Sequence, residues 1–281
     1  MAYDFQDKTV IITGGSEGVG AATARKFAEH GANLVLVART KKNLERVAEE
    51  LRTRTRVEIV AMDVSDTDAC VNLFKKAEFE FGGVDILVNN AGYHQRGPVE
   101  AVSPEDLSAM IDVNLKAPIV LSRLAIKYLE QSGGGAIINV ASLAGRTPVP
   151  GSATYSASKS GLRAFTFALG EELRGSGIKL AAVSPGPIDT GFIMSNIDEV
   201  TDITFSQPMS TADEVAQEIL NLVGNNKRER SMPPASGLLT TLSYLFPRLF
   251  RLLRPLLNRK GRNVKRKLKA QMRKLEEEQS A

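Results

Sequence analysis

Two residues of this sequence, Tyr155 and Lys159, have the types and the spacing to move a proton. They lie four residues apart in a stretch whose pattern predicts a helix over residues 154–174, so both side chains project from one helix face. An unperturbed tyrosine has a pKa of about 10 and transfers protons poorly near neutral pH. A cation about 4 Å away, at an effective dielectric constant near 20, favours the phenolate by about 4 kcal/mol. The pair therefore predicts general acid–base chemistry, although Tyr-x-x-x-Lys alone is more often a helix-surface pair.

A cluster of glycines near the start of the chain predicts a binding site for a diphosphate. Gly14, Gly18 and Gly20 follow an apolar run and precede a predicted helix. Glycine lets the backbone turn sharply and approach a ligand, and the N-terminus of the helix attracts negative charge. A glycine cluster alone is weak evidence, but the order strand, turn, helix is that of a dinucleotide site.

These residues need a scaffold, and the rest of the sequence predicts one. Along residues 1–226, short apolar runs alternate with longer amphipathic stretches, which is typical of βαβ units around a parallel sheet. The runs lack polar alternation, as expected for strands that helices cover on both faces. The predicted strands are 9–13, 34–37, 57–61, 85–88, 136–140 and 179–183, and the predicted helices lie near 18–30, 41–53, 67–81, 104–131, 154–174 and 212–224. We therefore expect an α/β fold, with a Rossmann-type doubly wound parallel sheet over residues 1–235.

The order of the motifs resembles that of the short-chain dehydrogenase/reductase family. The glycine turn has the spacing G-x-x-x-G-x-G rather than the G-x-G-x-x-G of most Rossmann dehydrogenases. The resemblance covers about residues 5–225 and continues through Asp63-Val64, Asn89–Gly92, Asn114, Ser142, Tyr155–Lys159 and Pro185–Thr190. It implies an enzyme that transfers a hydride between a nicotinamide and a ketone or secondary alcohol.

The same resemblance implies catalytic roles for Asn114, Ser142, Tyr155 and Lys159. Tyr155 would protonate the developing alkoxide, and Ser142 would donate a hydrogen bond to the same oxygen. Lys159 would also hold the nicotinamide ribose, and Asn114 would support a water-borne proton path. Taken singly, Ser142 would be a turn serine and Asn114 a polar residue within a helix. A nucleotide-binding scaffold or regulatory protein without turnover is the alternative, which the four intact residues disfavour.

The end of the second predicted strand bears on the choice between NAD and NADP. An acidic residue there would repel a 2′-phosphate, but this sequence has Arg39 and Thr40, and a guanidinium suits a phosphate. Glu17 argues the other way, because NADP-using members of the family often carry a basic residue at that place. NADP(H) is the expected cofactor and NAD(H) the alternative. The cofactor residues that the resemblance implies are Gly14, Ser16, Glu17, Gly18, Gly20, Arg39, Thr40, Asp63, Val64, Asn90, Ala91, Gly92, Tyr155, Lys159, Pro185, Gly186, Ile188 and Thr190.

Other reactive residue types are sparse in this chain. Its single cysteine, Cys70, excludes a disulfide scaffold and a cysteine-based metal site. His30 and His94 lack acidic or cysteine partners at metal-binding spacing, so we expect no metal, and His94 is placed at the substrate mouth. The chain opens with a short polar segment rather than a signal peptide, which predicts a cytoplasmic protein.

Charge divides the sequence into an acidic body and a basic tail. Residues 227–281 hold 15 Lys and Arg against 4 Asp and Glu, a net charge of +11, whereas residues 1–226 carry a net charge of −7. Within residues 238–257 the leucines and phenylalanines share one face of a predicted helix and the arginines lie on the other, with Pro247 kinking or restarting it. Residues 259–274 supply nine more Lys and Arg and a second apolar face, formed by Val264, Leu268, Met272 and Leu275. We therefore treat residues 236–281 as a basic, amphipathic C-terminal tail.

Five functions compete for this tail. The favoured one is an interfacial helix on an anionic membrane, which would make the protein peripheral on the cytoplasmic face. Packing at a subunit interface is the main alternative. A membrane-spanning helix is disfavoured because the uncharged stretch 231–247 is short and contains three prolines. Binding to nucleic acid is disfavoured because residues 258–281 contain no aromatic residue for base stacking, and a basic adaptor for an acidic partner stays open.

The tail also bears on the substrate and the assembly that we expect. Together with the Gly14-Gly15-Ser16 start, it resembles that of 3-ketodihydrosphingosine reductases, which are membrane-associated members of the family. A membrane-bound enzyme would take a hydrophobic substrate, such as a fatty or sphingoid ketone, a steroid or a retinoid, under a flap at residues 186–210. Family resemblance further implies a homodimer or homotetramer that assembles through the helices near 104–131 and 154–174.

Overall fold

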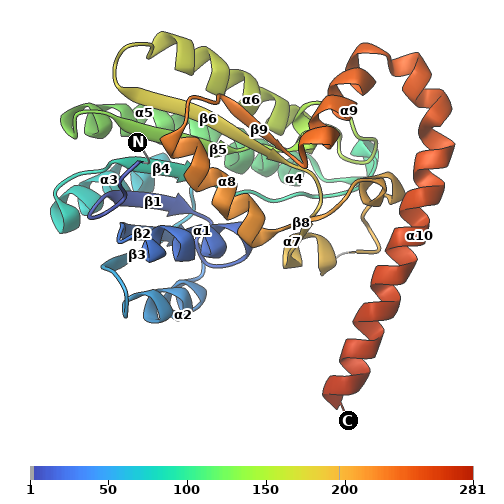
Figure 1. Cartoon of the computed structure of the whole chain (residues 1–281), viewed down its shortest axis with the longest axis horizontal. Helices are drawn as coiled ribbons and strands as arrows, with labels where there is room; N and C mark the ends of the chain where they lie inside the picture. Colours follow the sequence, from blue (N-terminus) through green and yellow to red (C-terminus); the bar gives the residue numbers. More distant parts are fainter. Residues whose placement is uncertain (1–2, 196, 281) are drawn as a thin grey trace.

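The parallel sheet predicted from the apolar runs forms the centre of the structure (Figure 1). The computed structural model describes residues 3–195 and 197–280, and in the last helix it describes side chains as far as Met272. All six predicted strands are present within two residues of their expected ends, and a short strand from the beginning of the basic segment completes the sheet. The strands lie in the order β3-β2-β1-β4-β5-β6-β9 and are parallel: β1 (Thr9–Thr13), β2 (Asn33–Ala38), β3 (Val57–Ala61), β4 (Ile86–Asn89), β5 (Gly135–Val140), β6 (Ile178–Pro185) and β9 (Glu229–Met232).

Helices cover both faces of the sheet, as the doubly wound prediction requires. Alternate strand residues enter different cores, so that Val10 and Ile12 pack on one side of β1 and Ile11 on the other. The first core is closed by α1 (Gly18–Glu29), α2 (Lys41–Leu51) and α8 (Ala212–Gly224), and the second by α3 (Thr67–Phe81), α5 (Ala117–Gln131) and α6 (Ala153–Glu172). The α/β fold class is confirmed.

The winding of the sheet creates a crevice at its centre. From β1 the chain adds β2 and β3 on one side, and it then returns to add β4, β5, β6 and β9 on the other. Loops that leave the carboxyl ends of β1 and β4 therefore diverge, and ligands of such sheets bind at this switch point. The remaining short elements are η1 (Val99–Ala101), η3 (Leu143–Gly145), β7 (Ile188–Asp189), α7 (Gly191–Met194), η4 (Asp202–Ser206) and β8 (Ser210–Thr211).

The helix predicted over residues 104–131 is interrupted. It begins as α4 (Pro104–Ile111), widens into a π-helical turn, η2 (Asp112–Lys116), and continues as α5. A π turn inserts an extra residue into the helical ladder and often marks a functional position. Here it contains Asn114, which is fully buried.

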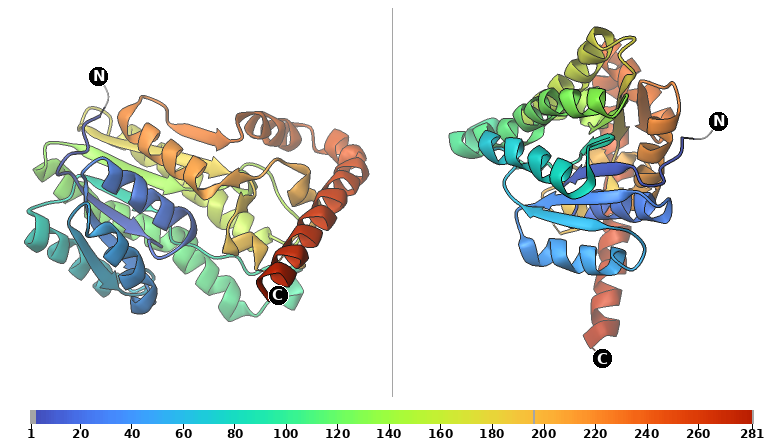
Figure 2. Two further views of the ribbon diagram at one scale, coloured as in Figure 1. Left: turned by 60° about the horizontal axis from the view of Figure 1, so that its bottom comes forward. Right: turned by 90° about the vertical axis from the view of Figure 1, so that its left-hand side faces the viewer.

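The tail forms two helices that meet at Pro247, the residue at which the pattern predicted a kink or a restart. α9 (Pro234–Leu245) ends two residues before Pro247, and α10 (Pro247–Ser280) then runs without a break from the first predicted helical segment into the second. Pro247 thus restarts the helix, because a proline is tolerated in a first turn. Figure 1 and Figure 2 show α10 passing α7 along one side of the molecule, with its far end projecting beyond the sheet. Within the described residues, no helix is both long and apolar enough to cross a bilayer.

Candidate active site

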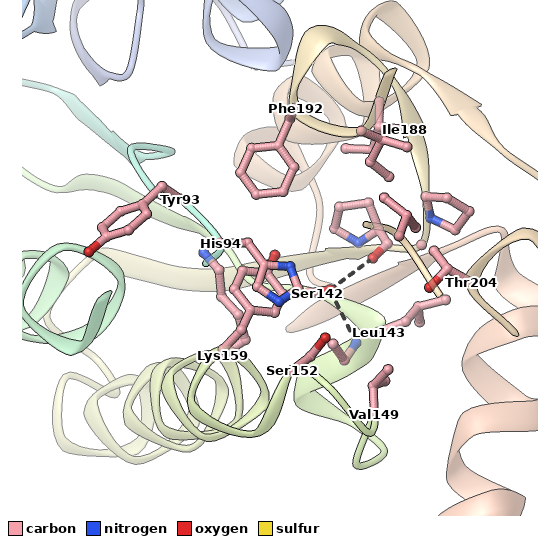
Figure 3. A pocket seen from close by; sticks show the side chains of 18 of the residues that line it. Tyr93, His94, Ser142, Leu143, Val149, Ser152, Lys159, Ile188, Phe192 and Thr204 are labelled. Carbon is pink, nitrogen blue, oxygen red and sulfur yellow. Dashed lines mark hydrogen bonds between the residues drawn. The ribbon is translucent and has the colours of Figure 1, made fainter. Parts of the chain in front are cut away.

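A cavity of about 740 Å³ lies at the carboxyl ends of the strands and brings most predicted site residues together. Figure 3 shows its inner part, with Ser142, Lys159 and His94 near one another and Phe192 across from them. Three of the four predicted catalytic residues, Ser142, Tyr155 and Lys159, line it. All predicted cofactor residues except Gly20 also line it: Gly14, Ser16, Glu17, Gly18, Arg39, Thr40, Asp63, Val64, Asn90, Ala91, Gly92, Tyr155, Lys159, Pro185, Gly186, Ile188 and Thr190.

The glycines of the first turn have two separate tasks. Gly14 has a φ of +66°, a left-handed conformation that a side chain rarely adopts, and Gly18 leaves open backbone at the start of α1. Gly20 lies behind the cavity wall, because a Cβ there would be 2.0 Å from the carbonyl oxygen of Gly14. Gly20 therefore allows α1 to pack on β1, while Gly14 and Gly18 expose backbone to a ligand. This cradle fits a dinucleotide diphosphate.

A threonine that the sequence analysis missed joins the two loops of the crevice. The hydroxyl of Thr13 accepts hydrogen bonds from the backbone N–H groups of Asn90 (3.0 Å) and Ala91 (2.9 Å). In return, Asn90 Nδ2 donates to the carbonyl oxygens of Thr13 (2.9 Å) and Gly14 (3.2 Å). A hydroxyl residue that ends a buried strand directly before a glycine turn is the signal that could have identified Thr13.

Asn114 lies behind the cavity and holds its wall rather than lining it. Its Oδ1 accepts from the backbone N–H of Tyr93 (3.0 Å), and its Nδ2 donates to the carbonyl oxygen of Tyr93 (2.9 Å) and to Ser158 Oγ (3.3 Å). Ser158 belongs to α6, between Tyr155 and Lys159. Asn114 therefore connects the loop after β4 to the helix that carries the predicted acid–base pair.

Ser142, Tyr155 and Lys159 approach one another from β5 and α6. Ser142 Oγ accepts from the backbone N–H of Ala144 (3.1 Å) and donates to the carbonyl oxygen of Pro185 (3.4 Å). Lys159 Nζ donates to the carbonyl oxygen of Val140 (2.9 Å) and lies 5.9 Å from the centre of the Tyr155 ring. Ser142 is thus hydrogen-bonded to the end of β6, and Lys159 to the end of β5.

The structure does not show the lowered tyrosine pKa that the Tyr–Lys spacing predicts. Burial raises the pKa of Tyr155, while its hydrogen bond with Ser142 and the charge of Arg96 lower it by less. Burial also lowers the pKa of Lys159 to about 8. The spacing of the two residues reports the charge of the lysine, but the loss of water around both groups has the larger effect on their pKa values. A protonated phenol at neutral pH is the form that can donate a proton in the reduction direction.

His94 and Arg96, from the loop after β4, form the wall opposite the strand ends. The His94 ring stacks on Tyr155 with 4.1 Å between centroids and 15° between planes. Burial, followed by the charges of Arg96 and Lys159, lowers the pKa of His94 to about 3, so its ring is neutral. Arg96 donates to the carbonyl oxygen of Phe192 (3.1 Å), and its guanidinium lies 5.5 Å from the centre of the Phe192 ring. His94 therefore lines the cavity as expected, and Arg96 is an addition that the sequence analysis missed.

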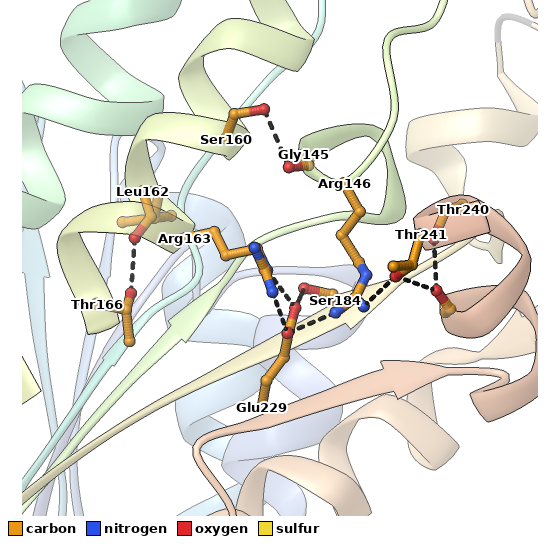
Figure 4. Close-up of polar contacts among 11 residues, drawn as sticks. Gly145, Arg146, Ser160, Leu162, Arg163, Thr166, Ser184, Glu229, Thr240 and Thr241 are labelled. Atoms are coloured by element: carbon orange, nitrogen blue, oxygen red, sulfur yellow. Dashed lines mark hydrogen bonds and ion pairs between the residues drawn. The ribbon is translucent and has the colours of Figure 1, made fainter. Parts of the chain in front are cut away.

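A charged cluster fixes the turn after Ser142 to the sheet, to α6 and to the tail (Figure 4). Glu229 of β9 accepts hydrogen bonds from Arg146, from Arg163 (2.8 and 2.9 Å) and from Ser184 (2.8 Å). Burial alone would raise the pKa of Glu229, but these three donors outweigh it and hold the pKa below its ordinary value. Arg146 also donates to Thr241 of α9 (2.7 Å). The loop that carries Ser142 is therefore tied to the C-terminal tail.

The tail forms one wall of the cavity, which the sequence did not predict. α9 contributes Leu239, Thr240 and Ser243, and α10 contributes Pro247, Phe250, Arg251, Arg254 and Leu257. Further along α10, the predicted apolar face packs on the predicted flap: Val264, Leu268 and Met272 contact a cluster of Ile193, Ile197, Val200 and Phe205. The side chain of Leu275, the fourth member of that face, lies outside the described residues.

Comparison with known proteins identifies the family. Residues 8–201, most of the chain, match the family model described as short chain dehydrogenase. The chain belongs to the short-chain dehydrogenase family. A short-chain dehydrogenase is an oxidoreductase that transfers a hydride to or from a nicotinamide dinucleotide, so the expected reaction class is confirmed at this level.

Individual relatives agree with this membership. An uncharacterised oxidoreductase of Staphylococcus epidermidis is 35% identical over 185 residues, which are 66% of this chain and 80% of the relative. Sulfoacetaldehyde reductase 2 of Chromohalobacter salexigens is 38% identical over 187 residues, 66% of this chain and 74% of the relative. Among solved structures, a putative short-chain alcohol dehydrogenase from Sinorhizobium meliloti superposes with a TM-score of 0.76 at 26% identity, over 84% of this short-chain dehydrogenase and 98% of that one.

Proposed function

We propose that this short-chain dehydrogenase is an NADP(H)-dependent reductase of hydrophobic, lipid-like carbonyl compounds, and that it works while docked on an anionic membrane. One observation carries the proposal. The cavity that contains Ser142, Tyr155 and the predicted cofactor residues continues to a wall made by the amphipathic tail. The C-terminal tail, which extends beyond the sheet and its helices, therefore borders the cavity in which substrate would react.

The preference for NADP(H) is supported by Arg39. This residue follows β2, is exposed at the cavity rim, and has no hydrogen bond or ion pair to another described residue. Its guanidinium is available to a 2′-phosphate at the position where a carboxylate would repel one. We expect Arg39→Asp to lower the ratio of kcat/KM for NADPH to kcat/KM for NADH by about a hundredfold, the loss of charged hydrogen bonds. An unchanged ratio in this variant would show that another group selects the cofactor.

The geometry supports a direct reduction mechanism. The loops after β1 and β4 would hold a nicotinamide dinucleotide, which would supply the hydride for the carbonyl carbon. When substrate binds, the Ser142 hydroxyl turns its proton from the carbonyl oxygen of Pro185 to the carbonyl oxygen of the substrate and stabilises the charge that develops there. The Tyr155 hydroxyl gives its proton to the same oxygen, and the Lys159 ammonium, held by the Val140 carbonyl, places positive charge near the phenolate that remains. His94 shields one face of the Tyr155 ring from water.

The side of the cavity away from the cofactor residues favours a hydrophobic substrate. Apolar side chains reach it from the turn after β5, from the flap and from the tail, and their carbon surface would hold a chain or ring system by excluding water. These residues are Leu143, Val149, Phe192, Ile193, Val200, Ile203, Leu239, Phe250 and Leu257.

The decisive test is NADPH oxidation by wild-type protein and Tyr155→Phe with fatty, sphingoid, steroid and retinoid carbonyls. We expect wild-type turnover of at least one class and a fall of at least a hundredfold in kcat for Tyr155→Phe, with NADPH binding retained. Tyr128→Phe is the matched control, because Tyr128 stacks on Phe74 in the second core, away from the cavity. Undiminished turnover by Tyr155→Phe would reject the assignment of the proton donor.

Membrane docking is supported by an outer apolar face on the tail. Nine large apolar side chains between residues 238 and 256 are at least 38% exposed: Leu238, Leu242, Tyr244, Leu245, Phe246, Leu249, Leu252, Leu253 and Leu256. So many large apolar side chains exposed within one segment mark an interaction surface. The net charge of +11 over residues 227–281 favours an anionic lipid surface as the occupant.

Docking is tested with Leu252→Glu/Leu256→Glu in sedimentation with vesicles of phosphatidylserine and phosphatidylcholine. We expect at least a hundredfold weaker binding, because each leucine inserted in lipid contributes about 1.5–3 kcal/mol. The control is Phe79→Glu, which removes an exposed apolar side chain of α3, on the body of the protein. Unchanged vesicle binding, together with a shift to a smaller assembly in solution, would assign the outer apolar face to a subunit interface instead.

A further inference from the structure

One side of the tail, which carries Arg251 and Arg254, borders the cavity. Pro247, Phe250, Arg251, Arg254 and Leu257 recur at three- and four-residue intervals, so they share one face of α10, and all five line the cavity. The leucines between them lie on the opposite face, where Leu252 is 78% and Leu256 65% exposed. A helix that packs on a soluble protein turns its leucines inward and its charges outward. Along this stretch α10 instead exposes its leucines and borders the cavity with Arg254, which is half-buried, and Arg251, whose side chain is exposed at the rim.

Two cations of this inner face have no counterion in the fold. Arg251 and Arg254, here called the inner arginines, make no hydrogen bond or ion pair with any residue in the described part of the chain. By contrast, Arg262, about two to three turns further along α10, pairs with Asp202 at 3.0 Å. The guanidinium groups of the inner arginines, with five N–H donors each, are thus available on a wall of the cavity.

The other charged residues that line the cavity near the tail do not neutralise the inner arginines. Apart from Glu17, Arg39, Asp63 and Lys159, which belong to the predicted cofactor site, the charged lining residues are Arg96, Glu199, Arg251 and Arg254. Burial lowers the pKa of Arg96, and the charges of Tyr155 and Glu199 oppose this by less, so the single carboxylate of this set acts on Arg96. The inner arginines therefore add positive potential that no acidic group of the lining balances.

We propose that the inner arginines form a subsite for an anionic group of the substrate. The inference rests on the proposed function and sharpens it: the substrate is an amphiphile that carries a reducible carbonyl, an apolar segment and, at its other end, a carboxylate, sulfonate or phosphate. The carbonyl meets Ser142 and Tyr155, the apolar segment lies against Phe250 and Leu257, and the anion accepts hydrogen bonds from Arg251 and Arg254. The same helix then binds lipid with one face and the charged end of the substrate with the other.

Two guanidinium groups can distinguish an anionic substrate from a neutral one, because they offer directional hydrogen bonds as well as positive charge. A planar guanidinium donates two parallel hydrogen bonds to one carboxylate or phosphate, whereas an ester or an alcohol offers it no negative charge. Arg251 and Arg254 lie three residues apart on one helix, which places both on the same face. An anionic amphiphile therefore gains binding energy at the tail that its neutral counterpart lacks.

The test compares each of a series of oxo fatty acids, differing in the distance from ketone to carboxylate, with its own methyl ester. NADPH oxidation is measured without vesicles for wild type, Arg251→Gln/Arg254→Gln, and Arg248→Gln, whose exposed arginine does not line the cavity. We expect wild type to prefer the acid of at least one pair by about tenfold or more in kcat/KM, mainly through KM. The double variant should lose this preference, and Arg248→Gln should keep it.

Each outcome decides between the possibilities. If wild type turns over acids and esters equally, the subsite is rejected while the reductase assignment stands. If it turns over neither with NADPH nor with NADH, the proposed function fails, and calorimetric binding of the oxo acids to the NADP⁺-loaded protein still tests the subsite. If the double variant keeps its acid preference but binds anionic vesicles less tightly, the inner arginines contact phospholipid headgroups and the inference is overturned.

Discussion

The two halves of α10 have similar sequence patterns and opposite surroundings. Along residues 247–257 every leucine except Leu257 is exposed, and the inner arginines border the cavity. Along residues 258–272 the apolar side chains of Val264, Leu268 and Met272 are packed on the flap. An amphipathic pattern therefore identifies an apolar helix face. Which stretch of that face is buried depends on where the rest of the protein packs against the helix.

The covered half is fitted to the flap in detail. Gly261 is buried against η4, and a Cβ there would lie 1.7 Å from the carbonyl oxygen of Asp202. Lys265 Nζ donates to the carbonyl oxygens of Asp198 (3.0 Å) and Val200 (2.7 Å), and Lys269 pairs with the Asp198 carboxylate. This part of the tail therefore holds the flap through hydrogen bonds to the flap backbone as well as through an ion pair.

The largest effect in this comparison should come from Gly261→Ala. Alanine favours a helix over glycine by about 1 kcal/mol, yet the methyl group cannot fit against Asp202, so we expect a net loss of about 3 kcal/mol in the stability of the packed tail. Limited proteolysis of the tail and kcat/KM for the ketone would both report it. Asn263→Ala, at an exposed position two residues away, is the control. Wild-type resistance to proteolysis in Gly261→Ala would show that the fitted contact does not hold the tail.

A smaller effect should follow when charge is removed from the outside of the covered half. Arg266 and Lys267 are exposed, and Arg266→Gln/Lys267→Gln removes two cations that would face an anionic membrane. At about 1 kcal/mol each, their loss should weaken vesicle binding about thirtyfold at low salt and by less at high salt. Ketone turnover without vesicles serves as the control, since neither residue lines the cavity. Salt-independent weakening would contradict a purely electrostatic role.

The smallest effect should come from Lys265→Met. This change keeps the apolar stem of the side chain but removes two hydrogen bonds to the flap, and we expect KM for the ketone to rise about fivefold with little change in kcat. Lys260→Met, which alters an exposed lysine on the same helix, is the comparison. A fall in kcat with an unchanged KM would indicate that Lys265 affects the reacting groups rather than substrate closure.

The sequence predicted the scaffold well because its signals are local and repeated. Continuous apolar runs marked the buried strands, and the glycine turn and the Tyr155–Lys159 spacing marked residues that the fold brings to one cavity. The π turn at Asn114 escaped prediction, since one inserted residue leaves helical periodicity nearly unchanged. The pKa of Tyr155 was misjudged because burial depends on the loops that surround the phenol and not on the spacing of two residues. The tail as a cavity wall was missed because that contact joins segments about a hundred residues apart, which no periodicity can report.

The Glu229 cluster gives the tail a place in the cooperative unfolding of the protein. Arg146 bonds both Glu229 and Thr241, so opening α9 leaves a buried guanidinium with half of its partners and loosens the turn that follows Ser142. Segments that share such buried partners exchange their amide hydrogens together, as one unit of local unfolding. The amides of α9 and of the turn at residues 143–146 should consequently show a common protection against exchange. The tail then belongs to the same thermodynamic unit as the loop that presents the serine, and is not an independent appendage.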